Sequence, residues 1–232
     1  MNGAPAKPMS GVAAHRQGCR LAYSGRMVAR HETHPGSAAA AGPAEFRAAV
    51  ESMRQASLRP EVFCEEMPAP QRIAPWSSAL SGDVTVDEED LGTGRLILLH
   101  DPAGNDAWDG TFRCVAYARA DLDPELGADP MLAAVGWSWL TEALEAHGAD
   151  FHAASGTVTC VTTESFGGMA DEPGTAQVEI RASWTPAVDD DGALDMTAHV
   201  EAWGELLCTA VGLPPVPEGV TAIPSRRGQR GT

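Results

Sequence analysis

The segment from Thr175 to Thr185 reads TAQVEIRASWT, and it decides the fold class of the chain. Apolar and polar side chains alternate along it, which is the pattern of a strand with one face in a core and the other in water. Its apolar face consists of Ala176, Val178, Ile180, Ala182 and Trp184, and its polar face of Gln177, Glu179, Arg181 and Ser183. The sequence therefore predicts a sheet that packs one face against helices.

Other strands are predicted on both sides of this segment in the sequence. Residues 111–119 alternate in the same way, with Arg113, Val115, Tyr117 and Arg119 on the polar side. Residues 96–99 are apolar on both phases, which is typical of a central strand covered on both faces. Further strands are predicted over residues 61–67, 80–86 and 157–166. A charged turn over 87–94 and a connector over 100–110 join neighbours, so the strands should pair antiparallel.

Three helices are predicted around these strands. The first runs from Pro43 to Leu58 with one apolar stripe, and Pro60 ends it, because proline disfavours helical geometry in the residue before it. The second begins with Asp129 as its N-cap and stops at Gly148. The third covers residues 194–211.

The order α, four strands, α, two strands, α is typical of an α+β fold, because strand and helix do not strictly alternate. We expect one domain over residues 43–213, with a mainly antiparallel sheet packed against about three helices. Residues 1–42 show no apolar periodicity and are predicted to be a disordered basic segment. Residues 214–232 are predicted to be an extended, proline-rich and basic tail.

The charge of the chain excludes two classes of partner. The sequence carries 32 acidic and 16 basic side chains, a net charge of −16. Residues 43–224 hold eight arginines against 31 carboxylates, a net charge of −23, whereas both ends are basic. Because nucleic acids and anionic membranes attract clustered lysine and arginine, we expect no direct nucleic-acid partner and no membrane partner.

The compartment is predicted from apolar runs and cysteines. No stretch is long and apolar enough to span a bilayer, and arginines interrupt every candidate signal region near the N-terminus. The odd number of cysteines and the lack of a C-x-x-C pair argue against a disulfide framework. Four are expected to be small buried side chains, and the alternative is a zinc site made by Cys114, Cys160 and a histidine. We therefore expect a cytoplasmic protein with reduced thiols.

Motifs for common enzyme classes are missing. The sequence contains no phosphate-binding, dinucleotide-binding, zinc-protease or nucleophile-elbow pattern. Its one lysine, Lys7, lies in the basic N-terminal segment. We predict no catalytic residue, no metal and no cofactor, which favours a non-catalytic protein-binding or adaptor module.

The segment from His100 to Gly110 reads HDPAGNDAWDG and is the richest in functional groups. It does not match a calcium loop, because positions 3, 6 and 12 counted from Asp101 are Ala, Asp and Phe. Two interpretations remain: a hairpin turn built by Asp, Asn, Gly and Pro, or a binding site. The second would support an alternative function as a metal-assisted hydrolase or other enzyme. The candidate residues are His100, Asp101, Asn105, Trp108 and Asp109.

Arginine and tryptophan side chains provide a second set of candidates. Trp137 and Trp139 lie about 200° apart on the second helix, so one is expected in the core and the other in a groove or interface. Arg113, Arg119 and Arg181 lie on the outward phases of two strands. They either pair with local carboxylates or dock an acidic partner, or a second copy of the chain, with the spare tryptophan as an apolar anchor.

Two weaker signals have structural explanations. Residues 164–168 read ESFGG and are typical of a glycine-containing hairpin turn. His199 precedes the apolar Val200 on the third helix, which favours an interior histidine over a general base.

Several phrases of the sequence resemble domain-of-unknown-function family 3000, a family of actinobacterial proteins. They are Arg59–Val62 (RPEV), Pro68–Arg72 (PAPQR), Leu99–Gly104 (LHDPAG), Gly136–Leu140 (GWSWL) and Glu164–Gly168 (ESFGG). The resemblance covers roughly residues 44–224. The family has no assigned activity, so the resemblance implies no catalytic or binding residue.

The order of elements also looks like that of type III secretion chaperone-like proteins, a likeness of architecture without a shared motif. Proteins of that fold mostly bind other proteins, often as dimers. The likeness therefore implies an unidentified protein partner, or a second copy of the chain.

Overall fold

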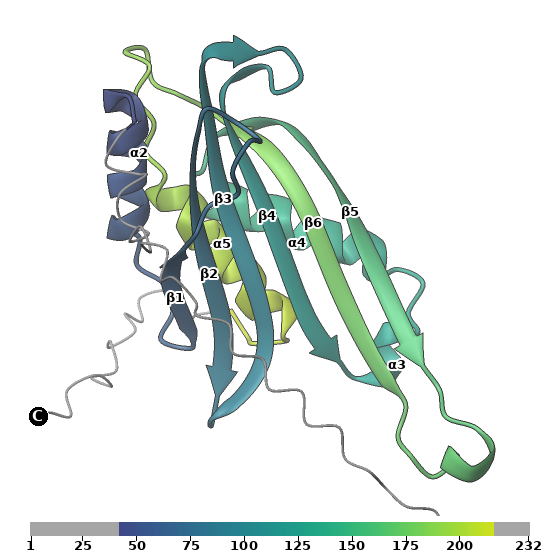
Figure 1. The fold of residues 1–232 in the computed structure, drawn as a ribbon. Helices are drawn as coiled ribbons and strands as arrows, with labels where there is room; N and C mark the ends of the chain where they lie inside the picture. Colours follow the sequence, from purple (N-terminus) through teal and green to yellow (C-terminus); the bar gives the residue numbers. More distant parts are fainter. Residues whose placement is uncertain (1–41, 216–232) are drawn as a thin grey trace, which may run out of the picture. The chain divides into compact units, whose positions relative to one another are not determined.

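A computed structural model of the chain describes residues 42–215, which form a single α+β domain. Six antiparallel strands make one sheet in the order β1-β2-β3-β4-β6-β5 (Figure 1). The strands are β1 (Val62–Met67), β2 (Trp76–Val86), β3 (Glu89–Asn105), β4 (Gly110–Leu122), β5 (Phe151–Thr163) and β6 (Thr175–Pro186). This confirms the predicted fold class. The predictions of a disordered N-terminal segment and a proline-rich tail concern residues that lie almost entirely outside the described range.

Three long helices accompany the sheet, as predicted. They are α2 (Ala44–Gln55), α4 (Leu132–Ala146) and α5 (Thr197–Ala210). A short helix, α3 (Pro124–Gly127), was not predicted, although Asp123 accepts a hydrogen bond from the Glu125 amide and Pro124 occupies its first turn. A 3-10 turn, η1 (Gly167–Met169), lies within the loop between β5 and β6, where a glycine turn was expected.

Two predicted connectors are mostly strand. The expected turn over 87–94 shrinks to Asp87 and Glu88, which both have positive φ, and β3 begins at Glu89. The expected connector over 100–110 is β3 as far as Asn105. These predictions were wrong because an exposed strand accepts charged and turn-forming side chains, so a polar run does not by itself indicate a loop.

Two helix starts lie later than predicted. The Asp129 carboxylate accepts a hydrogen bond from the Met131 amide at 2.8 Å, but α4 begins only at Leu132. Likewise, α5 begins at Thr197, whose amide donates to the Asp195 carboxylate at 2.9 Å. In both cases the acidic side chain accepts a hydrogen bond from the backbone amide two residues further on, and so organises the turn that leads into the helix.

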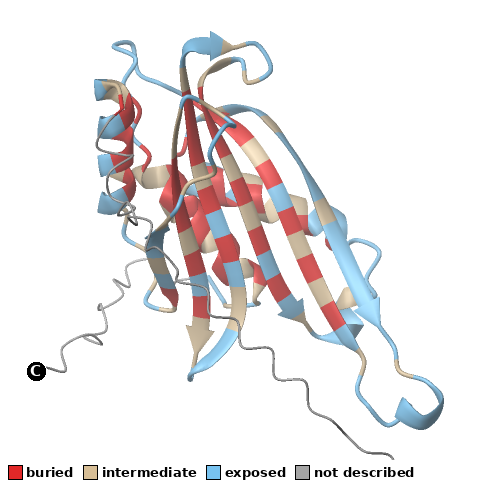
Figure 2. Cartoon of the chain, in the orientation of Figure 1, coloured by how far each residue is buried: buried red, intermediate tan, exposed pale blue. Residues whose placement is uncertain are grey.

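The helices lie on one face of the sheet, which we call the covered face (Figures 1 and 2). The core consists of alternate side chains of β3, β4 and β6 on this face and of the apolar stripes of α2 and α5 that pack on them. Its largest fully buried side chains include Trp184, Trp203, Phe46, Phe112, Leu96 and Leu98. The alternation read in residues 111–119 and 175–185 therefore identified the buried face correctly.

A pair of glycines lets α5 approach the sheet closely. Gly82 of β2 lies directly opposite Gly94 of β3. A Cβ atom on Gly82 would come within 2.7 Å of the Trp203 ring, and one on Gly94 would meet both Leu207 and the Tyr117 carbonyl oxygen. The two glycines thus form a depression that receives Trp203 and Leu207, and this seats α5 across β2 and β3.

Candidate binding face

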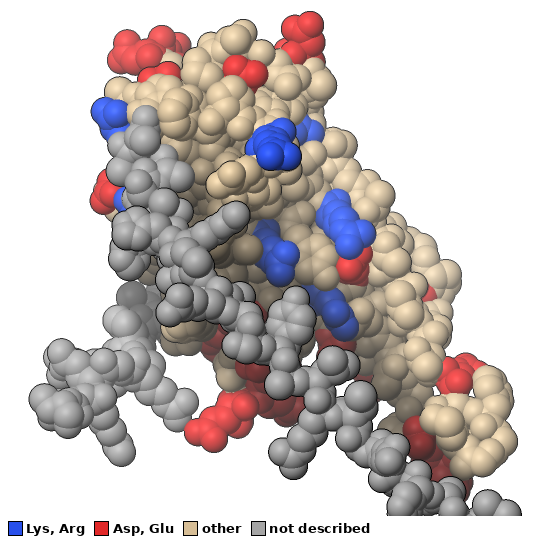
Figure 3. Space-filling view, viewed as in Figure 1, with Lys and Arg blue, Asp and Glu red and all other residues tan. Residues whose placement is uncertain are grey.

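Within residues 42–215, no helix covers the other face of the sheet, which we call the open face (Figure 1). Its middle is formed by Arg95 and Ile97 of β3, Val115 and Tyr117 of β4, and Arg181 of β6. In Figure 3, basic side chains gather over β3, β4 and β6 on this face. This grouping stands out because residues 43–224 contain only eight arginines against 31 carboxylates.

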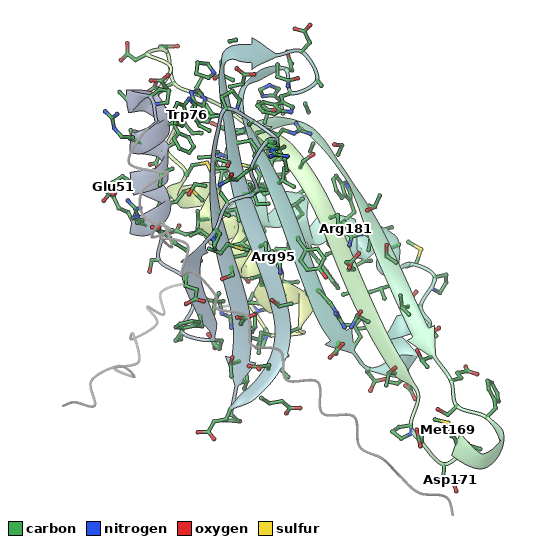
Figure 4. All side chains as sticks on the ribbon, in the orientation of Figure 1. Glu51, Trp76, Arg95, Met169, Asp171 and Arg181 are labelled. Carbon is green, nitrogen blue, oxygen red and sulfur yellow. The ribbon has the colours of Figure 1, made fainter. Side chains whose placement is uncertain are left out.

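Three side chains form a ladder across the open face. Arg95 pairs in register with Tyr117, which pairs in register with Arg181. The Arg181 guanidinium carbon lies 5.6 Å from the centre of the Tyr117 ring, within the range of a cation–π contact. Figure 4 shows Arg95 and Arg181 reaching out from β3 and β6 on the same side of the sheet. Cross-strand pairing therefore holds an aromatic ring between two cations.

Glu179 fixes two members of this ladder. Its carboxylate lies 2.9 Å from the Arg181 guanidinium and accepts a hydrogen bond from the Tyr117 hydroxyl at 3.0 Å. Burial raises the pKa of Tyr117, and the hydrogen bond to Glu179 raises it further, so the phenol stays neutral and remains a donor. By contrast, Arg95 makes no ion pair within residues 42–215.

The ladder borders a shallow hollow of about 390 Å³. Its lining residues are Arg95, Ile97, Val115, Ala116, Tyr117 and Arg181. Guanidinium groups bind carboxylates through paired hydrogen bonds, and the half-buried Ile97 and Val115 offer an apolar floor. The hollow can therefore hold an anionic group beside an apolar one.

Arg119 lies on the same face but in a different electrostatic setting. It lines a hollow toward the β2–β3 turn together with three carboxylates, Asp83, Asp90 and Asp121. The positive charge of Arg119 is therefore offset by its surroundings, whereas Arg181 pairs with Glu179 and Arg95 makes no ion pair within residues 42–215.

Arg113 was expected to point outward from the sheet, but the structure shows that it is buried. Only 6% of the residue is exposed, and its guanidinium donates to the Ala153 carbonyl, the Thr185 hydroxyl, the Ser155 hydroxyl and both the carbonyl and hydroxyl oxygens of Ser183. Burial lowers the pKa of this guanidinium. Arg113 therefore ties β4 to β5 and β6, and it cannot reach a partner without breaking these bonds.

His100 is likewise interior rather than part of an open site. It is 1% exposed and its ring is stacked between Phe46 of α2 and Phe112 of β4. Its Nδ1 lies 3.0 Å from the Thr111 carbonyl, so that nitrogen carries the proton and donates. Its Nε2 faces Glu45 at 3.5 Å. His100 therefore anchors α2 to the covered face of the sheet.

The other candidates of this segment build the β3–β4 hairpin. Asp101 and Asn105 each accept a hydrogen bond from the backbone amide two residues further on, as in Asx turns. The Trp108 carbonyl accepts a hydrogen bond from the Thr185 hydroxyl, and the Asp109 carbonyl lies 2.9 Å from the His152 ring. The turn interpretation accounts for these contacts.

Trp137 and Trp139 lie on the covered side of the sheet, away from the arginine ladder. Both are half-buried and pack against the core, and Trp137 rests over Gly156 of β5. Neither indole is fully buried in the core, and the expectation that one of them lies in a groove or interface stays a prediction. The structure also does not bring either indole to the same surface as Arg119 and Arg181.

The cysteines do not form the alternative zinc site. Cys114 is buried and lies beside the Met196 sulfur, whereas Cys160 is exposed on β5. Among residues 42–215, no group of three or more His, Cys, Asp or Glu side chains is arranged to hold a metal ion. The prediction that Cys160 is buried was wrong, because β5 is the edge strand of the sheet and most of its side chains are exposed. Burial raises the pKa of Cys64 to about 11 and that of Cys208 to about 12.

His199 is a buried side chain with a defined partner, as predicted. The Trp184 indole donates to its Nδ1 at 3.2 Å, so the neutral ring carries its proton on Nε2. Burial lowers the pKa of His199 to about 4. The ring lines a hollow of about 450 Å³ together with three carboxylates, Asp150, Asp189 and Asp195, of which the last two accept backbone hydrogen bonds of their own turns.

Sequence reasoning missed the centre of the open face, namely Arg95, Ile97 and Tyr117 acting with Arg181. The alternation of residues 111–119 placed Tyr117 beside the arginines, but it did not single it out. Arg95 and Ile97 are two residues apart, which places them on one face of a strand. That spacing indicated that Arg95 and Ile97 share one face of the strand. The apolar run over residues 96–99 instead favoured a strand that is covered on both faces.

Comparisons with known proteins identify the family of the chain. None of the helices in the described range is long and apolar enough to cross a membrane. No curated protein and no solved structure matches the chain significantly. The likeness to type III secretion chaperone-like proteins therefore stays a prediction. The family described as protein of unknown function (DUF3000) matches residues 42–221, which covers the whole domain, and the chain belongs to this family.

Proposed function

We propose that the protein is a non-catalytic binding module whose open face takes an acidic and partly apolar segment of another protein. The observation that carries this proposal is the Arg95–Tyr117–Arg181 ladder on the helix-free face of a strongly acidic domain. Reduced thiols and the acidic composition support the further inference that this binding occurs in the cytoplasm.

The geometry supports a ligand that carries two carboxylates and an apolar side chain. Arg95 and Arg181 belong to strands that are second neighbours, so their backbones lie about 10 Å apart. Two carboxylates of the ligand at a similar separation pair with the two guanidiniums. An apolar side chain of the ligand, placed between these carboxylates, rests on Ile97 and Val115. Tyr117 lies between the two arginines and offers its ring to that side chain.

The rest of the acidic surface adds selectivity. Residues 43–224, with a net charge of −23, repel acidic ligands at long range, so only a segment that reaches the arginine ladder gains from its charge. This favours a modest affinity that depends on the correct placement of carboxylates rather than on net charge.

A peptide series tests the proposal. The probe is a short synthetic peptide in which one glycine separates a phenylalanine from a glutamate on either side, so that the three side chains share one face of an extended chain. Its control carries glutamines in place of the glutamates. Fluorescence anisotropy should show binding of the glutamate peptide to the wild-type protein, with at least about a tenfold loss of affinity in Arg95→Glu with Arg181→Glu.

The matched control is Arg47→Glu with Arg54→Glu, which makes the same change of net charge on α2. Circular dichroism confirms that both double variants are folded. If the two double variants lose affinity equally, net charge rather than the ladder governs binding. Equal binding of the glutamate and glutamine peptides would contradict recognition of carboxylates.

The alternative function, a metal-assisted hydrolase centred on residues 100–109, is tested separately. Asp101 and Asn105 are engaged in turn hydrogen bonds, which supports the non-catalytic proposal. A thermal-shift screen of divalent metals should therefore give no specific stabilisation. A shift of several degrees for one metal that is lost in Asp101→Ala would favour the enzyme instead.

A further inference from the structure

The two edges of the sheet are built differently. β1 is six residues long and carries Glu65 and Glu66, the latter paired with Arg54. β5 is thirteen residues long, and most of its side chains are exposed, as its pale blue colour in Figure 2 shows. No other element in residues 42–215 pairs with its outer side. The edge at β5 therefore presents a row of backbone donors and acceptors without a strand partner.

The β5 edge also lacks the charges that normally protect such a strand. Residues 151–163 read FHAASGTVTCVTT, without a single Asp, Glu, Lys or Arg. In a chain with a net charge of −16, this is an edge where two copies can approach without placing acidic side chains against each other. Threonine and valine, which dominate its second half, favour extended strands.

One half of β5 is regular enough to accept another strand. The register against β6 shifts between His152 and Ser155, where Ala153 has a φ of 49° and its carbonyl binds Arg113. From Ser155 to Thr163 the register is unbroken. The free part of the edge is therefore the nine-residue stretch from Ser155 to Thr163.

We propose that two copies of the chain join through antiparallel pairing of residues 155–163 of β5, which gives one continuous sheet across a two-fold axis. Two residues that pair across antiparallel strands have their side chains on the same face of the sheet. In a pairing of two identical strands, both residue numbers are therefore odd or both are even, and their sum is the same even number for every pair. The residue whose number is half of this sum pairs with the same residue of the other copy. Full overlap of the stretch places Thr159 opposite Thr159, with Val158 opposite Cys160.

This pairing is independent of the proposed function. The edge lies two strands from the centre of the Arg95–Tyr117–Arg181 ladder, so the open face of each copy remains accessible in the dimer. Screening by salt reduces the mutual repulsion of two acidic copies and should therefore strengthen their association.

Analytical ultracentrifugation of the full chain tests the proposal. The wild type should sediment as a dimer, with twice the 24.3 kDa mass of the chain, and should associate more tightly as salt is raised. Thr159→Lys should convert it to a monomer, because two lysines would face each other at the axis. Phe63→Lys, at an exposed position of the opposite edge strand, should leave the dimer unchanged.

Cysteine cross-linking tests the register and covers the case in which Thr159→Lys misfolds. In a background without Cys19, Cys64 and Cys160, Thr159→Cys should form a disulfide-linked dimer under mild oxidation, whereas Phe63→Cys should not. A monomeric wild type at high micromolar concentration would overturn the proposal. A dimer that persists in folded Thr159→Lys, or that cross-links equally through Phe63→Cys, would also overturn it.

Discussion

The covered face and the open face of the sheet are made by alternate residues of the same strands, yet they are used differently. On the covered face, Leu96, Leu98 and Trp184 are completely excluded from water beneath α2, α4 and α5. On the open face, Arg95 and Arg181 are exposed and Ile97 is only half-buried. The covered face is therefore built for stability, whereas the open face keeps cations and apolar surface available in a domain that otherwise carries mostly acidic charge.

The difference shows that the two phases of one strand can serve separate purposes. Side chains of the covered face are held by close packing, such as the fit of Trp203 over Gly82 and Gly94. Side chains of the open face are positioned by cross-strand pairs, such as Tyr117 with Arg181. Substitutions on the two faces should therefore differ in what they change, stability on one face and binding on the other.

The largest expected effect comes from adjacent residues on opposite faces. Leu96→Ala should lower the free energy of unfolding by about 4 kcal/mol, because it opens a cavity under α5. Ile97→Ala should cost about 1 kcal/mol, since Ile97 already contacts water. Urea denaturation of both variants measures the difference. Similar losses would mean that the open face is as important to the core as the covered face.

The next effect separates two arginines of the open face. Arg113→Met should lower the free energy of unfolding by about 3 kcal/mol, because the buried oxygens that bind Arg113 lose their donors. Arg181→Met should change it by less than about 0.5 kcal/mol, because that side chain is exposed and its pair with Glu179 is screened. Thermal or urea denaturation checks both. A small effect of Arg113→Met would contradict its role in holding β5.

A smaller effect on the covered face depends on pH. The folded chain lowers the pKa of His199 to about 4, whereas an unfolded histidine titrates near 6.5. Between these values the unfolded chain binds a proton that the folded chain does not, so stability falls as the pH is lowered from about 6.5 to about 4. This contributes about 2–3 kcal/mol over the window.

His199→Gln is the matched control for this pH dependence. Glutamine does not titrate, and its carbonyl oxygen can still accept the hydrogen bond from Trp184. The variant should lose less stability than the wild type over the same pH window in urea titrations. Parallel curves for the two proteins would show that His199 does not titrate on unfolding.

The sequence predicted the fold class and the covered face because both depend on local alternation, which is clear in residues 111–119 and 175–185. It could not distinguish the buried Arg113 from the exposed Arg119, because both lie on the same phase of β4. Arg113 is buried by the bulge of β5 at Ala153, a contact between segments far apart in the sequence. Burial of an individual side chain on a polar face therefore escapes pattern analysis.

Two further features also depend on tertiary arrangement. Cys160 lies on the apolar phase of its strand but is exposed, because β5 is the edge strand of the sheet. One of Trp137 and Trp139 was expected near the arginines, but helical periodicity does not tell which face of a sheet a helix covers. The centre of the open face was visible only in part, because the apolar run 96–99 concealed that Ile97 and Arg95 share a face.

The most direct test of the open face as a binding surface is a nuclear magnetic resonance titration of isotope-labelled protein with the glutamate peptide of the binding assay. The account predicts that shift changes concentrate at Arg95, Ile97, Val115, Tyr117 and Arg181. It also predicts that Leu206 and Leu207 on α5 and Thr159 on the β5 edge remain unchanged. Shift changes confined to the helices or to β5, or no saturable change at all, would contradict the central claim.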